Sequence, residues 1–219
     1  MLDATSTRVL VASKIYNQFL DKMKQRAEAL RVGYQLDPAS QLGPLVSAAQ
    51  LATVERYVRL GKEEGAEVIT GGQRAQVAGL EGGFYYKPTI FAGAKNSMRI
   101  AQEEIFGPVL TVLRAPDIAT AIQIFNQSDY ALTGGIFSRS PANIERARAE
   151  CECGNFYINR PITGSRVDLQ PYGGFKMSGL GTKAGGPDYL IQYMDARTVT
   201  ENTLRRGFAP SAEVLEALG

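Results

Sequence analysis

The sequence predicts an α/β protein, with an open, mostly parallel sheet and helices on both faces. Short apolar runs alternate with segments of helical periodicity, and turn-forming residues separate them. The most regular stretch predicts strand, helix, strand, helix and strand over residues 109–113, 117–127, 133–138, 140–150 and 155–159. This alternation requires right-handed crossovers, which place the strands parallel in one sheet.

The first strand is predicted over Arg8–Ala12 (RVLVA). Ser13 is positioned to cap the helix that follows, and Gly33 to end it. Apolar side chains recur in between at helical spacing: Tyr16, Phe19, Leu20, Met23, Ala27 and Leu30.

A second helix is predicted after a loop over residues 34–45. Ser47 and Gln50 form a capping-box pattern, in which each side chain bonds to the backbone N–H of the other residue. The apolar face then continues toward Gly61 through Leu51, Val54, Tyr57 and Val58.

Further strands are predicted at Ala66–Thr70, which Gly71 and Gly72 would end, and at Phe84–Phe91. Pro88 marks the latter as an edge or bulged strand, because proline has no N–H to donate. Ser140 and Pro141 suit the N-cap and first turn of a helix that reaches about Glu150.

Composition excludes several classes of function. A net charge of +2 over 219 residues argues against nucleic acid as the main partner. No apolar run approaches the roughly 18–20 residues of a membrane span, and residues 1–7 lack the apolar core of a signal peptide. The only cysteines, Cys151 and Cys153, indicate a reducing, cytoplasmic setting.

Histidine is absent, which removes Ser-His-Asp and Cys-His catalysis and the commonest transition-metal ligand. The Cys151-Glu152-Cys153 pair has no third Cys or His to complete a site, so no metal site is predicted. These cysteines follow a predicted helix, whose carboxyl end disfavours thiolate, so we interpret them as structural.

Two segments suggest binding. Glu103 and Glu104 stand before Ile105-Phe106-Gly107-Pro108, where a carboxylate could accept hydrogen bonds from sugar hydroxyls or could simply be solvated. After the strand at residues 155–159, the turn Thr163–Ser165 offers consecutive backbone N–H groups for a carboxylate or phosphate. The alternative is a glycine-rich loop that only changes the chain direction.

Three motifs, in order, resemble the C-terminal half of an aldehyde dehydrogenase: EEIFGPVLTV, GNFYINR and QPYGGFKMSGLGTKAGGPDYL. Within that superfamily, ITGS, QPYGG and AGGPDYL resemble the glutamate γ-semialdehyde (Δ1-pyrroline-5-carboxylate) dehydrogenases, which complete proline catabolism and are sometimes fused to proline dehydrogenase. The resemblance extends over about residues 4–202.

The resemblance assigns roles to five residues. Glu104 would hold the ribose hydroxyls of the nicotinamide half of NAD, and Phe106 would pack beside the nicotinamide. Gly164 and Ser165 match the loop that anchors the substrate carboxylate through backbone N–H groups. Tyr172 matches an aromatic position, usually Phe, that packs on the aliphatic part of the substrate.

Some family features have no counterpart in this sequence. The family's nucleophilic cysteine, in a pattern like C-S-A-T-S-R, falls on Leu2 or Asp3, and neither side chain can attack an aldehyde as a thiolate does. The glutamate base of the E-L-G-G motif and the N-terminal cofactor domain are also missing. We therefore predict a truncated member of the family, inactive alone, with no catalytic residue of its own.

The expected organisation is a catalytic-type domain over residues 1–187, a strand arm for oligomerisation over 188–203, and a tail over 204–219. RTVTEN, at Arg197–Asn202, alternates like a strand and predicts a homo-oligomer formed by strand addition. Two alternatives remain open: a non-catalytic assembly or binding module, and an isolated anion-binding domain that uses Gly164 and Ser165.

Overall fold

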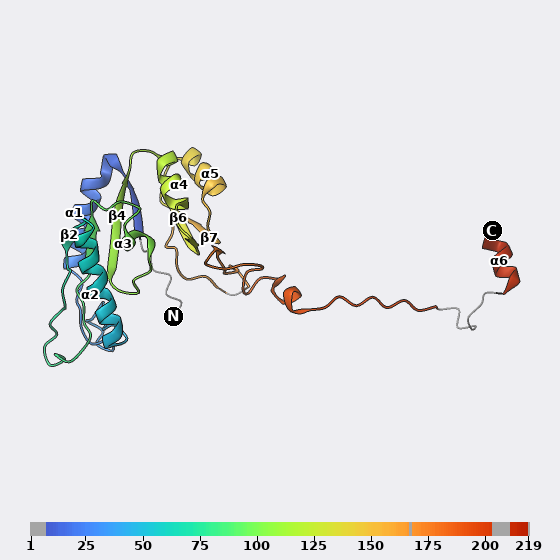
Figure 1. The fold of residues 1–219 in the computed structure, drawn as a ribbon, viewed down its shortest axis with the longest axis horizontal. Helices are drawn as coiled ribbons and strands as arrows, with labels where there is room; N and C mark the ends of the chain where they lie inside the picture. Colours follow the sequence, from blue (N-terminus) through green and yellow to red (C-terminus); the bar gives the residue numbers. More distant parts are fainter. Residues whose placement is uncertain (1–7, 167, 203–210, 219) are drawn as a thin grey trace.

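The central sheet has four strands in the order β1-β4-β3-β2. A computed structural model describes residues 8–166, 168–202 and 211–218. The strands are β1 (Arg8–Ala12), β2 (Glu67–Thr70), β3 (Thr89–Ala92) and β4 (Val109–Ala115). β1, β4 and β3 are parallel, while β2 is antiparallel to β3. The α/β fold with a mostly parallel sheet is therefore confirmed (Figure 1).

Two small sheets lie apart from the central one. β6 (Thr133–Ile136) pairs in parallel with β7 (Asn155–Ile158), and β5 (Tyr130–Ala131) pairs antiparallel with β8 (Phe175–Lys176). The prediction of one continuous sheet through the 109–159 stretch is thus wrong. Since β4 already has β1 and β3 along its edges, β6 cannot pair with it.

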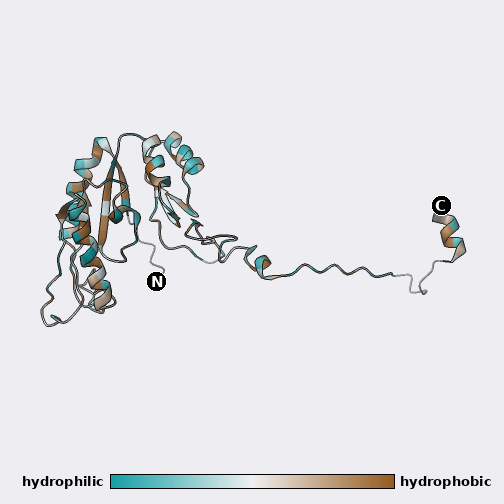
Figure 2. Cartoon of the chain, in the orientation of Figure 1, coloured by the Kyte–Doolittle hydropathy of each residue, from teal (hydrophilic) through white to brown (hydrophobic). Residues whose placement is uncertain are grey.

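Two helices, α1 (Tyr16–Glu28) and α2 (Ala48–Glu63), cover opposite faces of the central sheet. The other helices are α3 (Arg99–Gln102), α4 (Ile118–Asn126), α5 (Pro141–Glu150) and α6 (Ala212–Leu218), with 3-10 turns at Ser13–Ile15 and Tyr189–Tyr193. Consecutive residues of β3 point to opposite faces: Ile90 packs in the cluster under α1, and Phe91 in the cluster under α2. Figure 2 shows this apolar interior along β4.

The start of α1 differs from the prediction. Ser13 does not cap the helix; its hydroxyl donates to the carbonyl of Ala115 at 3.2 Å, since residues 13–15 form a 3-10 turn. The helix ends at Glu28, before Gly33, because the chain already turns back toward Leu42, whose carbonyl accepts from the Gly33 N–H.

β3 was expected at an edge and lies inside the sheet. All four of its residues are buried between β4 and β2. Pro88 immediately precedes the strand, so its missing N–H removes no ladder hydrogen bond. The irregularity lies on β2, between Val68 and Thr70.

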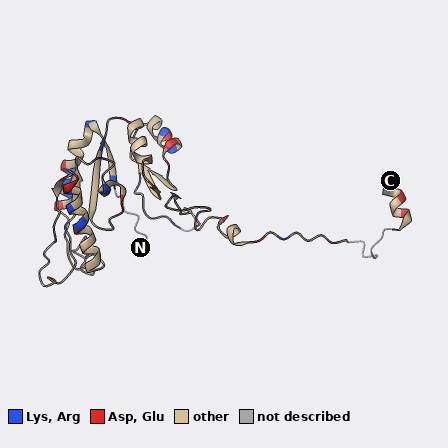
Figure 3. Cartoon of the chain, in the orientation of Figure 1, with Lys and Arg blue, Asp and Glu red and all other residues tan. Residues whose placement is uncertain are grey.

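Beyond the 3-10 turn at Tyr189–Tyr193, the chain leaves the domain as an extended arm (Figure 1). The predicted strand Arg197–Asn202 is not formed, because no strand among the described residues runs beside it. Charged residues are prominent on α1, α2 and α5, and α6 carries acidic ones (Figure 3). Among the described residues, no helix is long and apolar enough to cross a membrane.

Candidate functional site

The two predicted acids have different environments. Glu103 accepts hydrogen bonds from Arg99 Nε at 2.5 Å and Nη2 at 2.9 Å, and from the Tyr57 hydroxyl. The Arg99 guanidinium and then the Tyr57 hydroxyl lower the pKa of Glu103 to about 2. Glu103 is therefore a structural carboxylate, while the neighbouring Glu104 side chain is exposed.

Phe106 adopts an unusual backbone conformation. Its φ is +52°, a left-handed value that is costly for a bulky side chain, and its side chain is 58% exposed. Gln50 stabilises this turn, because its Nε2 donates to the carbonyls of Ile105 at 2.7 Å and Phe106 at 2.9 Å. At the next position, a Cβ on Gly107 would lie 2.4 Å from Val54 Cγ2, so glycine allows the turn to reach α2.

The capping box at Ser47 is consequently only half formed. The Ser47 hydroxyl accepts from the Gln50 N–H at 3.2 Å, as predicted. The Gln50 side chain bonds to the Phe106 turn instead of returning to Ser47. Sequence reasoning thus found Gln50 but assigned it a local partner rather than one 55 residues away.

The predicted anion-binding turn follows β7. Gly164 is exposed and has φ +82°, while Ser165 is half-buried and its hydroxyl is hydrogen-bonded to the Tyr157 hydroxyl. Among the described residues, no acceptor is bonded to the N–H of Gly164 or Ser165. Both N–H groups are therefore without a partner within the described part of the chain, and the binding of an anion by this turn stays a prediction.

The backbone of Tyr172 pairs with Ala184, and Asn155 holds the residues on either side of it. Its N–H and carbonyl both bond to Ala184 at 2.9 Å. Asn155, in β7, donates to the Pro171 carbonyl at 2.8 Å and accepts from the Gly173 N–H at 3.1 Å. The backbone that carries the Tyr172 ring is therefore held against the start of β7.

Tyr172 also has titratable neighbours. Burial, followed by the neighbouring Tyr157 and Glu104 groups, raises the pKa of Tyr172. The Tyr157 hydroxyl is in turn hydrogen-bonded to the Ser165 hydroxyl of the predicted turn. Sequence reasoning did not find Tyr157 or Asn155, which resemble ordinary strand residues in the sequence.

The remaining predicted positions supply no nucleophile. Burial raises the pKa of the Cys151 thiol to about 11 and that of the Cys153 thiol to about 12, so both are poor thiolates. Leu2 and Asp3 lie outside the described residues. Within the described part of the chain, no group of three or more Cys, Asp or Glu residues could hold a metal ion.

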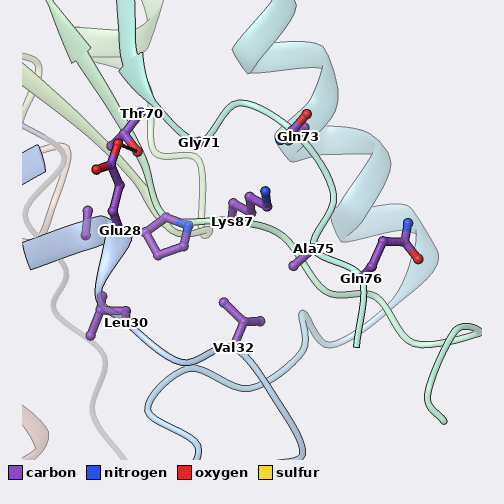
Figure 4. Close-up of a pocket in the computed structure, with 11 residues that line it drawn as sticks. Glu28, Leu30, Val32, Thr70, Gly71, Gln73, Ala75, Gln76 and Lys87 are labelled. Carbon is purple, nitrogen blue, oxygen red and sulfur yellow. Dashed lines mark hydrogen bonds between the residues drawn. The ribbon is translucent and has the colours of Figure 1, made fainter. Parts of the chain in front are cut away.

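A cavity of about 470 Å³ is lined by residues outside the candidate site (Figure 4). It is lined by the end of α1, the end of β2 and the segment before β3, including Glu28, Thr70 and Lys87. Thr70 donates to the Glu28 carboxylate at 3.2 Å. None of the five predicted binding residues borders this cavity, so it is separate from the candidate site.

Comparisons with known proteins agree with the motifs. A 1-pyrroline-5-carboxylate dehydrogenase of Geobacillus sp. (strain WCH70) is 42% identical over 195 residues, which cover 89% of this chain and 37% of that protein. A Thermus 1-pyrroline-5-carboxylate dehydrogenase structure with bound NAD superposes with a TM-score of 0.79 at 42% identity, over 87% of this chain and 36% of that one.

A proline utilization A structure from Bdellovibrio bacteriovorus gives a TM-score of 0.84 at 45% identity, over 94% of this chain and 21% of that one. The chain thus spans well under half the length of these relatives. The sequence model of the aldehyde dehydrogenase family matches residues 4–199, nearly the whole chain. On this evidence, the chain belongs to the aldehyde dehydrogenase family.

Proposed function

We propose that this chain forms part of an NAD-dependent aldehyde dehydrogenase that oxidises glutamate γ-semialdehyde to glutamate in proline catabolism. The observation that supports the proposal is the Gly164–Ser165 turn, whose N–H groups have no acceptor among the described residues and whose serine is hydrogen-bonded to Tyr157. In this proposal the turn binds the substrate carboxylate, and Glu104 binds the ribose hydroxyls of the cofactor. The names of the Geobacillus and Bdellovibrio relatives support this substrate.

The residues present fit one end of the cofactor. The exposed Glu104 carboxylate is an acceptor suited to ribose hydroxyls, and the exposed Phe106 ring offers an apolar face to a nicotinamide. When bound, NAD would accept the hydride from the substrate's aldehyde carbon. The role of this chain is to orient the nicotinamide end through the turn that Gln50 stabilises.

The substrate would lie between the amide turn and Tyr172. The N–H groups of Gly164 and Ser165 donate to the substrate carboxylate, and the Tyr172 ring covers its aliphatic carbons. The family usually has Phe at the position of Tyr172, so the hydroxyl is a departure from the family pattern. In this proposal the aldehyde end of the substrate extends toward the nicotinamide that Glu104 and Phe106 would hold.

We further propose that these 219 residues are inactive when expressed alone, because neither cysteine is an effective nucleophile. The test measures NADH formation from glutamate γ-semialdehyde, with and without a polypeptide that carries the preceding part of a relative. We expect activity only in the mixture. Turnover by the chain alone would disprove the inactivity, and failure of both arms would disprove the proposed reaction.

Exposed apolar side chains favour a second function, that of an assembly module. They are concentrated after β7 and along the arm: Leu169, Phe175, Met177, Leu180, Leu190, Ile191, Tyr193, Met194 and Val199. Such a surface fits a second copy of the chain, to which the arm would add a strand. Light scattering is expected to show a dimer or larger; a monomer at every concentration would contradict this proposal.

The reducing cytoplasm remains the proposed compartment, since Cys151 and Cys153 are both free thiols. The division of the chain at residue 187 also stays a prediction.

A further inference from the structure

The central sheet and the small parallel sheet each have an open edge. β1 is an outer strand of the central sheet and pairs with β4, while β6 pairs with β7. Among residues 8–166, 168–202 and 211–218, no strand lies along the other edge of β1 or of β6. Open edges of this kind present backbone N–H and C=O groups that can pair with a further strand.

Helix α4 contacts both of these edge strands. It connects β4 to β6 and packs against β1 and β4. At its carboxyl end, the Arg8 side chain of β1 donates to the carbonyls of Ile124 at 3.1 Å and Phe125 at 2.8 Å. The Phe125 ring lies against β6, because a Cβ on Gly134 would be 2.2 Å from the Phe125 Cζ atom. The end of one helix therefore links β1 to β6.

The strands β1 and β6 run in the same direction. β1 is parallel to β4, and the connection through a single helix returns the chain so that β6 is parallel to β4 as well. The two strands do not pair with each other, so more than one strand spacing of about 4.8 Å separates them. One strand between them needs twice that spacing, about 10 Å, and would join the two sheets into one.

The strand that fits this gap is apolar on both faces. On one face of β1, Val9 and Val11 belong to the apolar cluster under α1. On the other face, Arg8 reaches the end of α4. Parallel strands with helices on both faces are near-continuous runs of Val, Ile and Leu, so we expect such a run in the missing neighbour of β1.

The seven residues before β1 are too few to supply this strand. A parallel neighbour is joined through a crossover of a dozen or more residues, and the strand itself comes in addition. The chain covers 37% of the Geobacillus relative, and its motifs resemble the C-terminal half of the family. The relatives therefore have a long preceding segment that can carry both the crossover and the strand.

We propose that the gap between β1 and β6 is a docking site for one apolar, parallel strand of the polypeptide that precedes these residues in the relatives. Arg8 is the positioning residue, because its hydrogen bonds to α4 hold β1 at a fixed distance from β6. The inference rests on the proposed function and deepens it, since strand addition becomes the way in which the preceding part combines with this chain.

Hydrogen exchange followed by NMR tests the docking site. The isotope-labelled chain is measured alone and mixed with an unlabelled polypeptide that carries the preceding part of the Geobacillus relative. Amides on the open edges of β1 and β6 should exchange fast in the chain alone and at least tenfold more slowly in the mixture. The matched control is β2, the opposite edge of the central sheet, where exchange should stay unchanged.

The role of Arg8 is tested by Arg8→Met, which keeps the length of the side chain and removes its donors. This variant should weaken the association of the two polypeptides about tenfold. Arg139→Met, at an exposed residue in the loop after β6, is the control and should bind like wild type. An amide spectrum like that of wild type shows that Arg8→Met is folded, and equal affinity of folded Arg8→Met and wild type would overturn the role of Arg8.

The exchange data separate this inference from the proposed reaction. Protection at β2, at only one of the two open edges, or already in the chain alone would overturn the docking site. Absence of protection in the mixture would do the same, and NADH formation in that mixture would leave the proposed function intact. Protection of both edges without NADH formation would support the docking site and contradict the proposed reaction.

Discussion

The two walls of the candidate site are supported in different ways. The first wall carries Glu104 and Phe106. The second wall carries Gly164, Ser165 and Tyr172. The first wall stands on a buried apolar cluster between α2 and the central sheet. The second wall depends on a few side chains that bond to the backbone: Tyr157, Asn155 and Lys183, whose Nζ donates to the Gly173 carbonyl at 2.8 Å.

This difference predicts different failures of the two walls. A wall supported by an apolar cluster loses stability when volume is removed beneath it, and the loss is global. A wall supported by hydrogen bonds opens locally when one bond is lost, while the rest of the domain stays folded. The proposed site joins a wall of each kind.

The largest effect is expected from Phe91→Ala. Phe91 is fully buried under α2, so its loss leaves a cavity and should cost about 3–5 kcal/mol of unfolding free energy. Urea denaturation measures it. Phe137→Ala, at a side chain that is 72% exposed, is the control and should change stability by less than about 0.5 kcal/mol. Similar losses in both variants would contradict the importance of the cluster.

Gly154→Ala should damage the second wall selectively. A Cβ there would lie 1.7 Å from the Gly173 carbonyl oxygen, so the two segments must separate at a cost of about 1–3 kcal/mol. Hydrogen exchange should accelerate at residues 171–176 and stay unchanged in β3. Gly82→Ala, with open space around the added Cβ, serves as control. If protection in β3 fell equally, the two walls would not be independent.

A smaller change is expected from Gln50→Ala, which releases the carbonyls of Ile105 and Phe106. The free energy needed to open the strained Phe106 turn should fall by about 1 kcal/mol, so the open form should be roughly fivefold more populated. Chymotrypsin cleavage after Phe106 provides the readout. Gln123→Ala, at an exposed residue of α4, should cleave like wild type. An unchanged cleavage rate in Gln50→Ala would show that Gln50 does not stabilise the Phe106 turn.

The smallest effect concerns pH. Since Arg99, and after it Tyr57, lower the pKa of Glu103 from 4.5 to about 2, these contacts stabilise the fold above pH 4.5, and the stabilisation is lost as pH falls toward 2. Both side chains are partly exposed, so the loss should stay below about 1 kcal/mol. Denaturation of Glu103→Gln should lack this component, whereas Glu145→Gln, in an exposed pair on α5, should retain it. If the unfolding free energies of wild type and Glu103→Gln changed identically with pH, the stabilising role of Glu103 would be refuted.

Several features could be predicted from short stretches of sequence. Asp117 and Ser140 cap α4 and α5, and their side chains accept from Thr120 and Asn143, because a cap involves only neighbouring residues. The strands β1, β4 and β7 were also located within a few residues. The family followed from motifs that keep their order along the chain.

The sequence by itself determined the α/β class, the starts of α2, α4 and α5, and the candidate residues Glu104, Phe106, Gly164, Ser165 and Tyr172. Only the tertiary structure decided that β6 and β7 form a separate sheet and that Gln50 stabilises the Phe106 turn. It alone placed Tyr157 between Ser165 and Arg160. The physical reason is range: caps and periodicity depend on near neighbours, whereas these contacts depend on which distant segments the packed sheet brings together.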